Sequence, residues 1–411
     1  MRICYTVQRT IGEPLTGSEN YIYDLARKLS EHDEVTILAT QRRQSQPAAT
    51  TEVGLARVLA FPVRDSRWMG LGIRYLMRKD ASGISRRVLA YPADGFLHSW
   101  SHGYWSPGMY EWLLAADLDV LHCQALPLST SWIGWRASRG KRFPFVITPA
   151  LHLADPNYDP PYISRILRDA DGIIAQTDTE RRYLIRLGIP AEDTWVIPPG
   201  VDVESWSHPP AGRFRAANGI AENQFVVLIP RKQEEKGTFH TLAALELLAR
   251  EGVHPSCVLL GTCPWPIQFR VRRWITKLAS LGTRVIDTGF LPRSAFRDCL
   301  AASDVVVEPS MADSFGMVYQ DSWMAGKPVI AADCGGIPDV VRNGENGLLV
   351  PFGSIESIAE SIRVLMSDPG HARRLGEAGN ATTLARYDLT KIADQIRQVY
   401  EVVIGRRERH R

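Results

Sequence analysis

The sequence predicts an α/β protein of two domains with a cleft, and three observations support this fold class. The chain has 411 residues, which is long for one domain, and 45% hydrophobic residues, enough for substantial cores. Short β-rich runs alternate with helical patterns along most of the chain, as in parallel sheets covered by helices. The alternation comes as two successive series, so we expect two similar halves.

The first half contains five strand-like runs, which are interspersed with helical patterns. These expected strands are residues 3–7, 35–39, 118–122, 145–148 and 172–176. The series ends in a Pro-Pro-Gly segment at 198–200, which cannot continue a helix or a central strand. We therefore place the hinge near residue 198 and the first domain at 1–197.

The second half repeats the pattern. Its expected strands are residues 225–229, 256–260, 284–288, 304–308 and 328–332. We place this domain at 198–388, and a helical stretch at 389–404 follows it. A terminal helix can cross back to the first domain of a two-domain protein, and residues 389–411 are the candidate for such a crossing.

Composition and charge exclude several classes of protein. The net charge of +3 leaves no field strong enough to make nucleic acid the main ligand. Residues 1–7 lack the long apolar core of a secretory signal, and no apolar run approaches the roughly 20 residues that a membrane-spanning helix requires. The six cysteines are scattered without a Cys-x-x-Cys pair, which favours reduced core residues. We therefore expect a cytoplasmic protein.

The segment 313–323 follows the expected strand at 304–308 and should open a helix near Phe315 and Gly316. The first N–H groups of a helix lack partners, and its positive dipole end suits a phosphate. Asp313 and Asp321 are eight residues apart, about two helical turns, so both carboxylates are expected on one side, where they could bind two hydroxyl-bearing parts of one ligand. In the simpler interpretation, Asp313 only caps the helix.

Two cations follow the first strand of the second half. Arg231 and Lys236 lie on a strand-to-helix loop, and Gly237 precedes an expected helix at 238–250. A forked guanidinium and a compact ammonium form a plausible diphosphate clamp. The alternative is a solvated charged loop.

In the first half, Gly17 precedes an expected helix at 20–29. It would allow close approach of a ligand to the backbone. The alternative is that Thr16 or Ser18 only caps the helix.

Together these motifs resemble glycosyltransferase family 4 in order and spacing, over nearly the whole chain. The matching motifs are Thr16-Gly17-Ser18-Glu19, the turn at 197–202, Arg231 with Lys236-Gly237, the segment 313–321, the segment 325–330 and Gly335-Gly336-Ile337-Pro338. The resemblance implies the GT-B fold, in which two Rossmann-like domains face each other across a cleft that holds the donor. It also implies transfer with retention of anomeric configuration and without a metal or other cofactor.

The resemblance further implies a role for each matching residue. Arg231 and Lys236 would hold the donor diphosphate, and Gly17 would approach it from the other domain, on the acceptor side. Asp313 would bind hydroxyls of the donor sugar, and Asp321 the nucleotide ribose. The remaining donor-binding candidates are Ser314, Phe315, Gly316, Met317 and Val318 beside the sugar and phosphate, and Phe290 and Leu291 near the base.

The sequence departs from the family pattern at four positions. Asp313 and Asp321 stand where the family usually has glutamates, and each is one methylene shorter. Pro230 replaces a usual glycine and Pro199 a usual asparagine. The two shorter acids affect the prediction of the donor sugar more than the prediction of the fold.

Two histidines are further candidates. His152 follows a first-domain strand where family members often place a histidine near the donor sugar and the acceptor. His102, flanked by Trp100, Tyr104 and Trp105, is a candidate of the same type, whose aromatic neighbours could stack on a sugar or pack in a core. Either histidine could instead be a structural hydrogen-bonding residue.

Two acid pairs resemble the metal-holding pair of the other major glycosyltransferase fold. They are Asp117 with Asp119 and Asp169 with Asp171, and each leads directly into an expected strand. We assign them to strand entry and expect no metal. The chain also lacks a Gly-x-Gly-x-x-Gly fingerprint after its first strand and a Gly-Lys-Ser/Thr phosphate loop, which disfavours dinucleotide redox chemistry and nucleotide hydrolysis.

Basic and aromatic residues mix in two segments, 64–87 and 269–274. Such a mixture could rest on an anionic membrane, bind an anionic acceptor or form a solvated helical face. Peripheral membrane contact through 64–87 is thus one open possibility.

The expected reaction moves a sugar from a nucleoside-diphosphate sugar, with UDP favoured, to a hydroxyl of an acceptor that is a small molecule, a glycan or a lipid-linked compound. An epimerase acting on a nucleotide sugar, and a non-catalytic nucleotide-sugar-binding subunit, are the alternatives. Product formation without an acceptor would indicate the epimerase, and binding without turnover would indicate the binding subunit.

Overall fold

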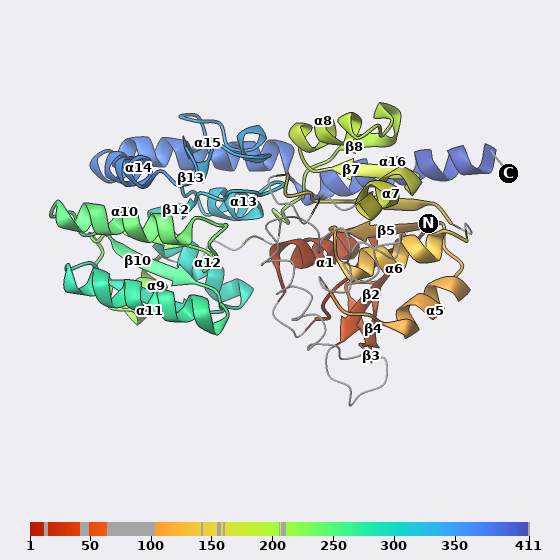
Figure 1. Ribbon diagram of the computed structural model, residues 1–411, viewed down its shortest axis with the longest axis horizontal. Coiled ribbons are helices and arrows are strands. Elements are labelled where there is room, and N and C mark those ends of the chain that lie inside the picture. Colours follow the sequence, from red (N-terminus) through yellow and green to blue (C-terminus); the bar gives the residue numbers. More distant parts are fainter. Residues whose placement is uncertain are drawn as a thin grey trace. The chain divides into compact units, whose positions relative to one another are not determined.

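The computed structural model describes residues 1–11, 15–41, 49–63, 103–140, 143–153, 158, 161–204, 206 and 211–409. It divides into two compact units (Figure 1). Unit 1 consists of Met1–Gly200 with Leu389–Arg411, and unit 2 is Val201–Asp388. The first passage between the units thus lies close to the predicted hinge at residue 198, and the terminal helix lies in unit 1.

In the described residues, unit 1 contains one sheet of strand order β3-β4-β2-β1-β5-β6-β7-β8. All neighbours pair in parallel except β3 and β4, which are antiparallel. The strands are β1 (Arg2–Val7), β2 (Glu34–Gln41), β3 (Ala49–Val53), β4 (Ala56–Pro62), β5 (Val120–Gln124), β6 (Phe145–Thr148), β7 (Gly172–Ala175) and β8 (Thr194–Val196). The helices are α1 (Gly17–Leu29), α5 (Pro107–Ala115), α6 (Ser129–Ser138), α7 (Pro161–Asp169), α8 (Asp178–Arg186), the short η2 (Ala191–Asp193) and α16 (Leu389–Arg409).

Unit 2 contains a parallel sheet of strand order β11-β10-β9-β12-β13-β14. The strands are β9 (Val226–Ile229), β10 (Ser256–Leu260), β11 (Val285–Gly289), β12 (Val305–Glu308), β13 (Val329–Ala332) and β14 (Leu348–Val350). The helices are α9 (Ala211–Ala217), α10 (Thr238–Arg250), α11 (Trp265–Ser280), α12 (Arg293–Ala302), α13 (Met317–Met324), the short η3 (Ile337–Asp339), α14 (Ile355–Ser367) and α15 (Pro369–Arg386).

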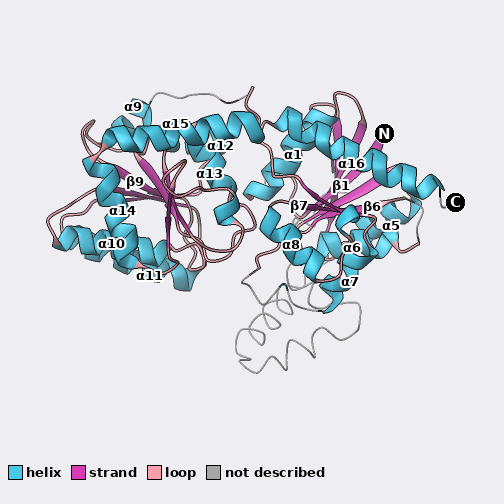
Figure 2. Ribbon diagram, turned by 90° about the horizontal axis from the view of Figure 1, so that it is seen from above, coloured by secondary structure: helices cyan, strands magenta, loops and turns pink. Residues whose placement is uncertain are grey.

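The apolar strands of unit 2 are buried on both faces. In β9, Val226 and Leu228 belong to the core beneath α12 and α13, whereas Val227 and Ile229 belong to the core beneath α10 and α14. Figure 2 shows helices on both sides of each sheet. Successive side chains of a strand point to opposite faces, so a continuous apolar run suits this layered arrangement.

Helix α16 packs on unit 1 through polar as well as apolar contacts. The Tyr400 hydroxyl lies 2.6 Å from Nδ1 of His122, and Nε of Arg397 lies 2.8 Å from a carboxylate oxygen of Asp33. Burial lowers the pKa of His122 to about 3, so the ring is neutral at physiological pH. Among the described residues, none of the helices has the length and apolar character that crossing a membrane requires.

Candidate active site

Two loops of unit 2 lie next to each other because their strands are neighbours. Strands β9 and β12 pair in parallel, so the loop 230–237 after β9 and the loop 309–316 after β12 leave the same edge of the sheet. The backbone joins them, since the Met311 N–H donates to the carbonyl of Glu235 at 2.8 Å. Residues that are far apart in sequence are thereby held at one carboxyl edge.

Gly237 permits the close approach of these loops. Its φ of +72° lies in the left-handed region, and a Cβ added there would lie 2.4 Å from the carbonyl oxygen of Pro309. The first loop is also closed on itself, because the Thr238 hydroxyl donates to the Arg231 carbonyl and accepts from the Gln233 N–H at 3.1 Å. The backbone carrying Arg231 and Lys236 is therefore fixed at both ends.

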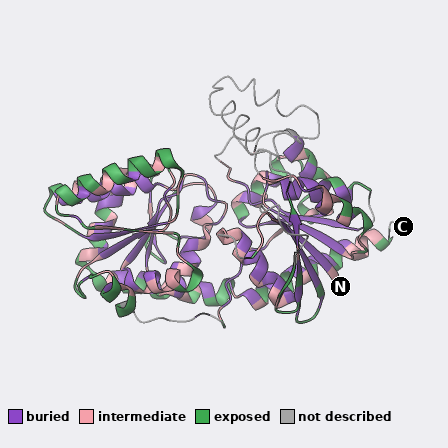
Figure 3. Ribbon diagram, turned by 90° about the horizontal axis from the view of Figure 1, so that it is seen from below, coloured by how far each residue is buried: buried purple, intermediate pink, exposed green. Residues whose placement is uncertain are grey.

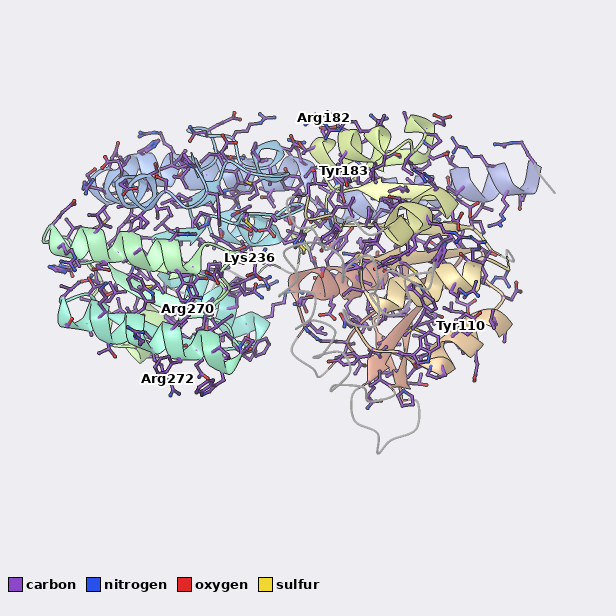
Figure 4. The ribbon with its side chains drawn as sticks, in the orientation of Figure 1. Tyr110, Arg182, Tyr183, Lys236, Arg270 and Arg272 are labelled. Atoms are coloured by element: carbon purple, nitrogen blue, oxygen red, sulfur yellow. The ribbon has the colours of Figure 1, made fainter. Side chains whose placement is uncertain are left out.

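The predicted residues Lys236 and Asp313 form an ion pair across the two loops. Their side chains are 12% and 9% exposed, so the pair is largely shielded from water (Figure 4 labels Lys236). Because a buried charge is costly without a partner, each of the two side chains stabilises the charge of the other. An incoming anion would compete with Asp313 for the ammonium group of Lys236. This ion pair therefore joins two of the four catalytic candidates directly.

Arg231 lies beside a carboxylate that the sequence analysis did not single out. Glu308, the last residue of β12, is 2% exposed, and its Oε2 is 3.8 Å from Nε of Arg231. Burial raises the pKa of Glu308 to about 7, Asp313 acts in the same direction, and Lys236 and Arg231 lower it. The Arg231 side chain remains 40% exposed, so its guanidinium can reach a ligand. The signal that could have revealed Glu308 is a single charged residue ending an otherwise apolar strand.

Helix α13 begins at Met317, and Gly316 is its N-cap with a φ of +84°. A Cβ at Gly316 would lie 2.3 Å from the Tyr319 ring, so glycine is required by the backbone as well as useful for ligand approach. Residues 313–316 are not helical. The helix therefore starts within about one residue of the predicted place, and Asp313 is not its cap. Because residues 313–316 are outside the helix, the spacing of eight residues is not two full turns, and the placement of the two carboxylates on one side stays a prediction. Asp321 is half-buried within α13.

The remaining donor-binding candidates of unit 2 differ in exposure. Ser314 and Met317 are half-buried, whereas Val318 is buried and the Phe315 ring packs edge-on against Tyr387 in the core. Only the backbone of Phe315 is thus suited to line a site.

After β11, Phe290 is 48% exposed, and Leu291 packs against the core. Lys232, the third cation of the first loop, is buried in an ion pair with Asp287 of β11, so it differs from its partly exposed neighbour Arg231.

In unit 1, Gly17 is the first residue of α1, so the predicted start at residue 20 is three residues late. Thr16 is the N-cap, and the Glu19 carboxylate accepts from the Thr16 N–H at 2.8 Å. A glutamate at this position reaching back to the cap residue is a known start signal that extends the helix to Gly17. The capping interpretation of Thr16 is confirmed, and the first-turn N–H groups begin at Gly17.

His152 lies on the loop after β6, stacked on Tyr158 with ring centroids 5.2 Å apart. The buried Glu180 of α8 holds this loop, because its carboxylate accepts from the N–H groups of Leu151 and Gln176, both at 2.7 Å. Burial raises the pKa of Glu180 to about 7, and the two N–H donors lower it. Sequence reasoning missed Glu180, which resembles any other acid in the first turn of a helix.

The acid pairs are engaged in structural contacts. Asp119 accepts from the Arg2 N–H at 2.7 Å, and Asp171 accepts from the Phe145 N–H at 2.8 Å, immediately before β5 and β7. Within the described ranges, no cluster of three or more His, Cys, Asp or Glu side chains is arranged to hold a metal. His102, Trp100 and the basic segment 64–87 lie outside the described residues.

The chain has two α/β units, each built on a mainly parallel sheet, and loops suited to phosphate lie at the carboxyl edge of the unit 2 sheet. This arrangement defines a fold class, the GT-B glycosyltransferases. The chain resembles the solved structure of Anabaena HepE in complex with UDP-glucose, with a TM-score of 0.73 and 23% identity over 98% of this chain and 100% of that chain. It also resembles sucrose-phosphate synthase from Thermosynechococcus elongatus, with a TM-score of 0.76 and 20% identity over 98% and 99% of the two chains.

Family models match both units. Residues 16–200 match the model described as "Glycosyl transferase 4-like domain", and residues 212–382 match "Glycosyl transferases group 1". D-inositol 3-phosphate glycosyltransferase of Xylanimonas cellulosilytica is 26% identical over 95% of this chain and 93% of its own. Alpha-maltose-1-phosphate synthase of Mycolicibacterium smegmatis is 30% identical over 57% of this chain, and the match spans 64% of that protein's length. The chain belongs to the family 4 type of glycosyltransferase and is an enzyme.

Proposed function

We propose that this enzyme transfers a sugar from a nucleoside-diphosphate sugar to an acceptor hydroxyl, with retention of anomeric configuration. The observation that carries the proposal is the meeting of Lys236, Arg231 and Asp313 on two adjoining loops at one sheet edge. A uridine nucleotide is favoured, because HepE, which has a similar fold, was solved with UDP and with UDP-glucose. The relatives have names that differ in substrate, so the acceptor stays open.

In the proposed reaction, the bond between the anomeric carbon and the diphosphate oxygen breaks, and negative charge grows on the leaving group. Arg231, Lys236 and the first N–H groups of α13 would meet that charge. The acceptor oxygen attacks the anomeric carbon from the same face, and its proton goes to the departing phosphate oxygen. The products are the glycosylated acceptor and the nucleoside diphosphate.

Asp313 has a double role in this proposal. Without donor it neutralises Lys236, and with donor its carboxylate would accept hydrogen bonds from sugar hydroxyls. When the diphosphate binds, Lys236 and Asp313 would exchange each other for new partners on the donor, so neither buried charge would be left unpaired. His152 of unit 1 is proposed to lie near the reacting sugar. Glu180 would help to position His152, because it holds the loop on which that histidine lies.

The test is release of nucleoside diphosphate by Arg231→Ala and Lys236→Ala in the full-length enzyme. Each substitution should lower kcat/KM by about a hundredfold or more, because it removes charge that stabilises the leaving group. Arg250→Ala is the matched control: Arg250 ends helix α10, which follows the loop of Arg231 and Lys236, is 61% exposed and pairs only with Glu246 among the described residues. Near-normal turnover by the folded Lys236 variant would refute the clamp.

The same assay separates the competing functions. Conversion of the donor sugar without any acceptor would instead indicate an epimerase. Donor binding without turnover on any acceptor would indicate a binding subunit.

We also propose that no metal ion takes part, because the two cations supply the positive charge that a divalent ion supplies elsewhere. Treatment with a chelator should leave turnover unchanged within error. Loss of activity on chelation, with recovery on adding Mg²⁺ or Mn²⁺, would refute this part of the proposal.

A further inference from the structure

Helix α11 has an inner face that packs on unit 2 and an outer face that meets solvent. Val271 and Leu278 are fully buried in the core beneath α10, and Ile267, Trp274 and Ile275 pack against that core. The outer residues are exposed, as Figure 3 shows for this side of the unit. The inner face alone accounts for the attachment of the helix, so the composition of the outer face needs a separate explanation.

The outer face begins with two large aromatic side chains in contact with solvent. Trp265 is 77% exposed and Phe269 is 55% exposed. They lie one helical turn apart and are stacked, with ring centroids separated by 6.4 Å. A neighbouring pair of exposed rings is unusual on a soluble surface and marks a contact site more often than a single exposed residue does.

The same helix is strongly basic. Its sequence contains Arg270, Arg272, Arg273 and Lys277 but no Asp or Glu. Two of these cations are already engaged: Arg270 pairs with Glu234 and lies over the Phe239 ring, and Lys277 pairs with Glu246. The other two, Arg272 and Arg273, are exposed and form no ion pair with any described residue.

The free cations lie on the same side of the helix as the aromatic rings. At about 100° per residue, Trp265, Phe269, Arg272 and Arg273 fall within about a quarter of the helix circumference. Figure 4 places Arg272 on the outer side of α11 and Arg270 on the side towards α10. The outer face is therefore a single strip with two rings at its start and two unpaired guanidinium groups beyond them.

We propose that this strip docks on an anionic lipid surface. Tryptophan and phenylalanine rings are stable at the level of lipid headgroups, where an apolar ring meets a wet boundary. Arginine binds phosphate through a planar fork and is attracted to a negatively charged bilayer. Both halves of the strip are thus matched by one partner.

Two parts of this protein could also be considered as partners of the strip, a second copy of the strip and the segment 64–87, and charge disfavours both. A second copy of the strip would bring four unpaired arginines together. The segment 64–87 contains seven Arg or Lys residues against two Asp, so it would also be repelled.

Docking would hold the candidate site beside the lipid. Helix α11 follows β10, which pairs in parallel with β9, so Trp265 lies towards the carboxyl edge from which the Arg231 loop also leaves. The docking surface itself does not depend on the proposed sugar transfer, because none of its residues belongs to the Lys236 and Asp313 site.

The test is co-sedimentation of the full-length protein with phosphatidylcholine vesicles that contain or lack phosphatidylglycerol. Wild type should bind the anionic vesicles, bind neutral ones much more weakly, and be released by high salt. The double variant R272E/R273E should bind anionic vesicles at least about tenfold more weakly, because each cation near an anionic surface contributes about a factor of five. W265S/F269S should also weaken binding and should reduce the part that salt does not release.

The matched control is R373E/R374E, which reverses two adjacent arginines of α15 that are 76% and 66% exposed. It should bind like wild type, and all variants should keep the unfolding temperature and UDP affinity of wild type.

Unchanged vesicle binding by R272E/R273E would overturn the proposal and assign the binding to another basic segment. Absence of wild-type binding would overturn it too, and a doubled mass in solution that W265S/F269S abolishes would assign the strip to self-association.

Discussion

Glu180 in unit 1 and Glu308 in unit 2 are both buried near the carboxyl ends of parallel strands, but the surroundings of the two carboxylates differ. Glu180 in unit 1 accepts hydrogen bonds from two backbone N–H groups, whereas Glu308 in unit 2 lies near Arg231 and Lys236. Burial raises the pKa of both to about 7. A perturbed pKa therefore does not by itself separate a residue that fixes a loop from one that balances reactive cations, and the neighbours decide.

The largest expected effect concerns the loop contact of unit 2. Gly237→Ala should lower the free energy of unfolding by about 3 kcal/mol, because it combines left-handed strain with a clash against Pro309. Gly188 in unit 1 has a similar φ of +83° but no atom within 4 Å of a new Cβ, so Gly188→Ala should cost only about 1 kcal/mol. Denaturant unfolding measures both, and equal losses would show that the close approach of the two loops contributes nothing.

The two glutamates should give stability the same pH dependence. Their carboxyl groups have pKa values of about 7 when folded, against an ordinary 4.5, so the folded protein binds more protons between these values. The free energy of unfolding should therefore fall as pH rises through this window, by at most about 3 kcal/mol for each group. Glu180→Gln and Glu308→Gln should each flatten the profile. A profile unchanged in both variants would contradict the assigned pKa direction.

Ligand binding should separate the same two variants. A diphosphate places negative charge beside Glu308, so UDP affinity should weaken as Glu308 ionises above about pH 7. Glu308→Gln should remove this dependence, whereas Glu180→Gln should retain it. Calorimetric titration with UDP across pH checks the difference, and identical behaviour of the two variants would place Glu308 away from the bound diphosphate.

The smallest effect concerns the attachment of α16 to unit 1. Tyr400→Phe removes hydroxyl contacts with Tyr5 and His122 and should destabilise the protein by about 1–2 kcal/mol. Tyr110→Phe is the control: that ring is half-buried and packs against Trp105. Thermal unfolding should distinguish the two, and equal unfolding temperatures would show that the buried hydroxyl network adds no stability.

Much of the fold could be predicted from local pattern. The bounds of β6, β10 and α10 agree with the expected runs, and the other expected strands differ from the observed ones by a few residues at most. These segments are apolar on both faces, so the sequence pattern reports burial directly. Strands β3, β4, β8 and β14 were not anticipated: β3, β8 and β14 lie at the edges of their sheets, and β8 and β14 have only three residues each.

The sequence predicted several residues of the candidate site but not which of them contact each other. Lys236 and Asp313 were both expected to contact a ligand, yet their mutual ion pair joins loops 77 residues apart. The helix was expected to begin near Phe315 and Gly316 and begins at Met317, with the left-handed Gly316 as its N-cap, so residues 313–316 do not continue the helical spacing towards Asp321. Glu308 and Glu180 were missed because their importance comes from burial and from neighbours on other strands.

Calorimetric titration of the full-length protein with UDP, comparing wild type with Lys236→Ala, measures whether the two loops of unit 2 hold a diphosphate. Wild type should bind UDP, and the variant should bind it at least about tenfold more weakly, because the ammonium would pair with the diphosphate. Equal affinity of the two folded proteins, or no UDP binding by wild type, would contradict a diphosphate site at the Lys236 and Asp313 loops.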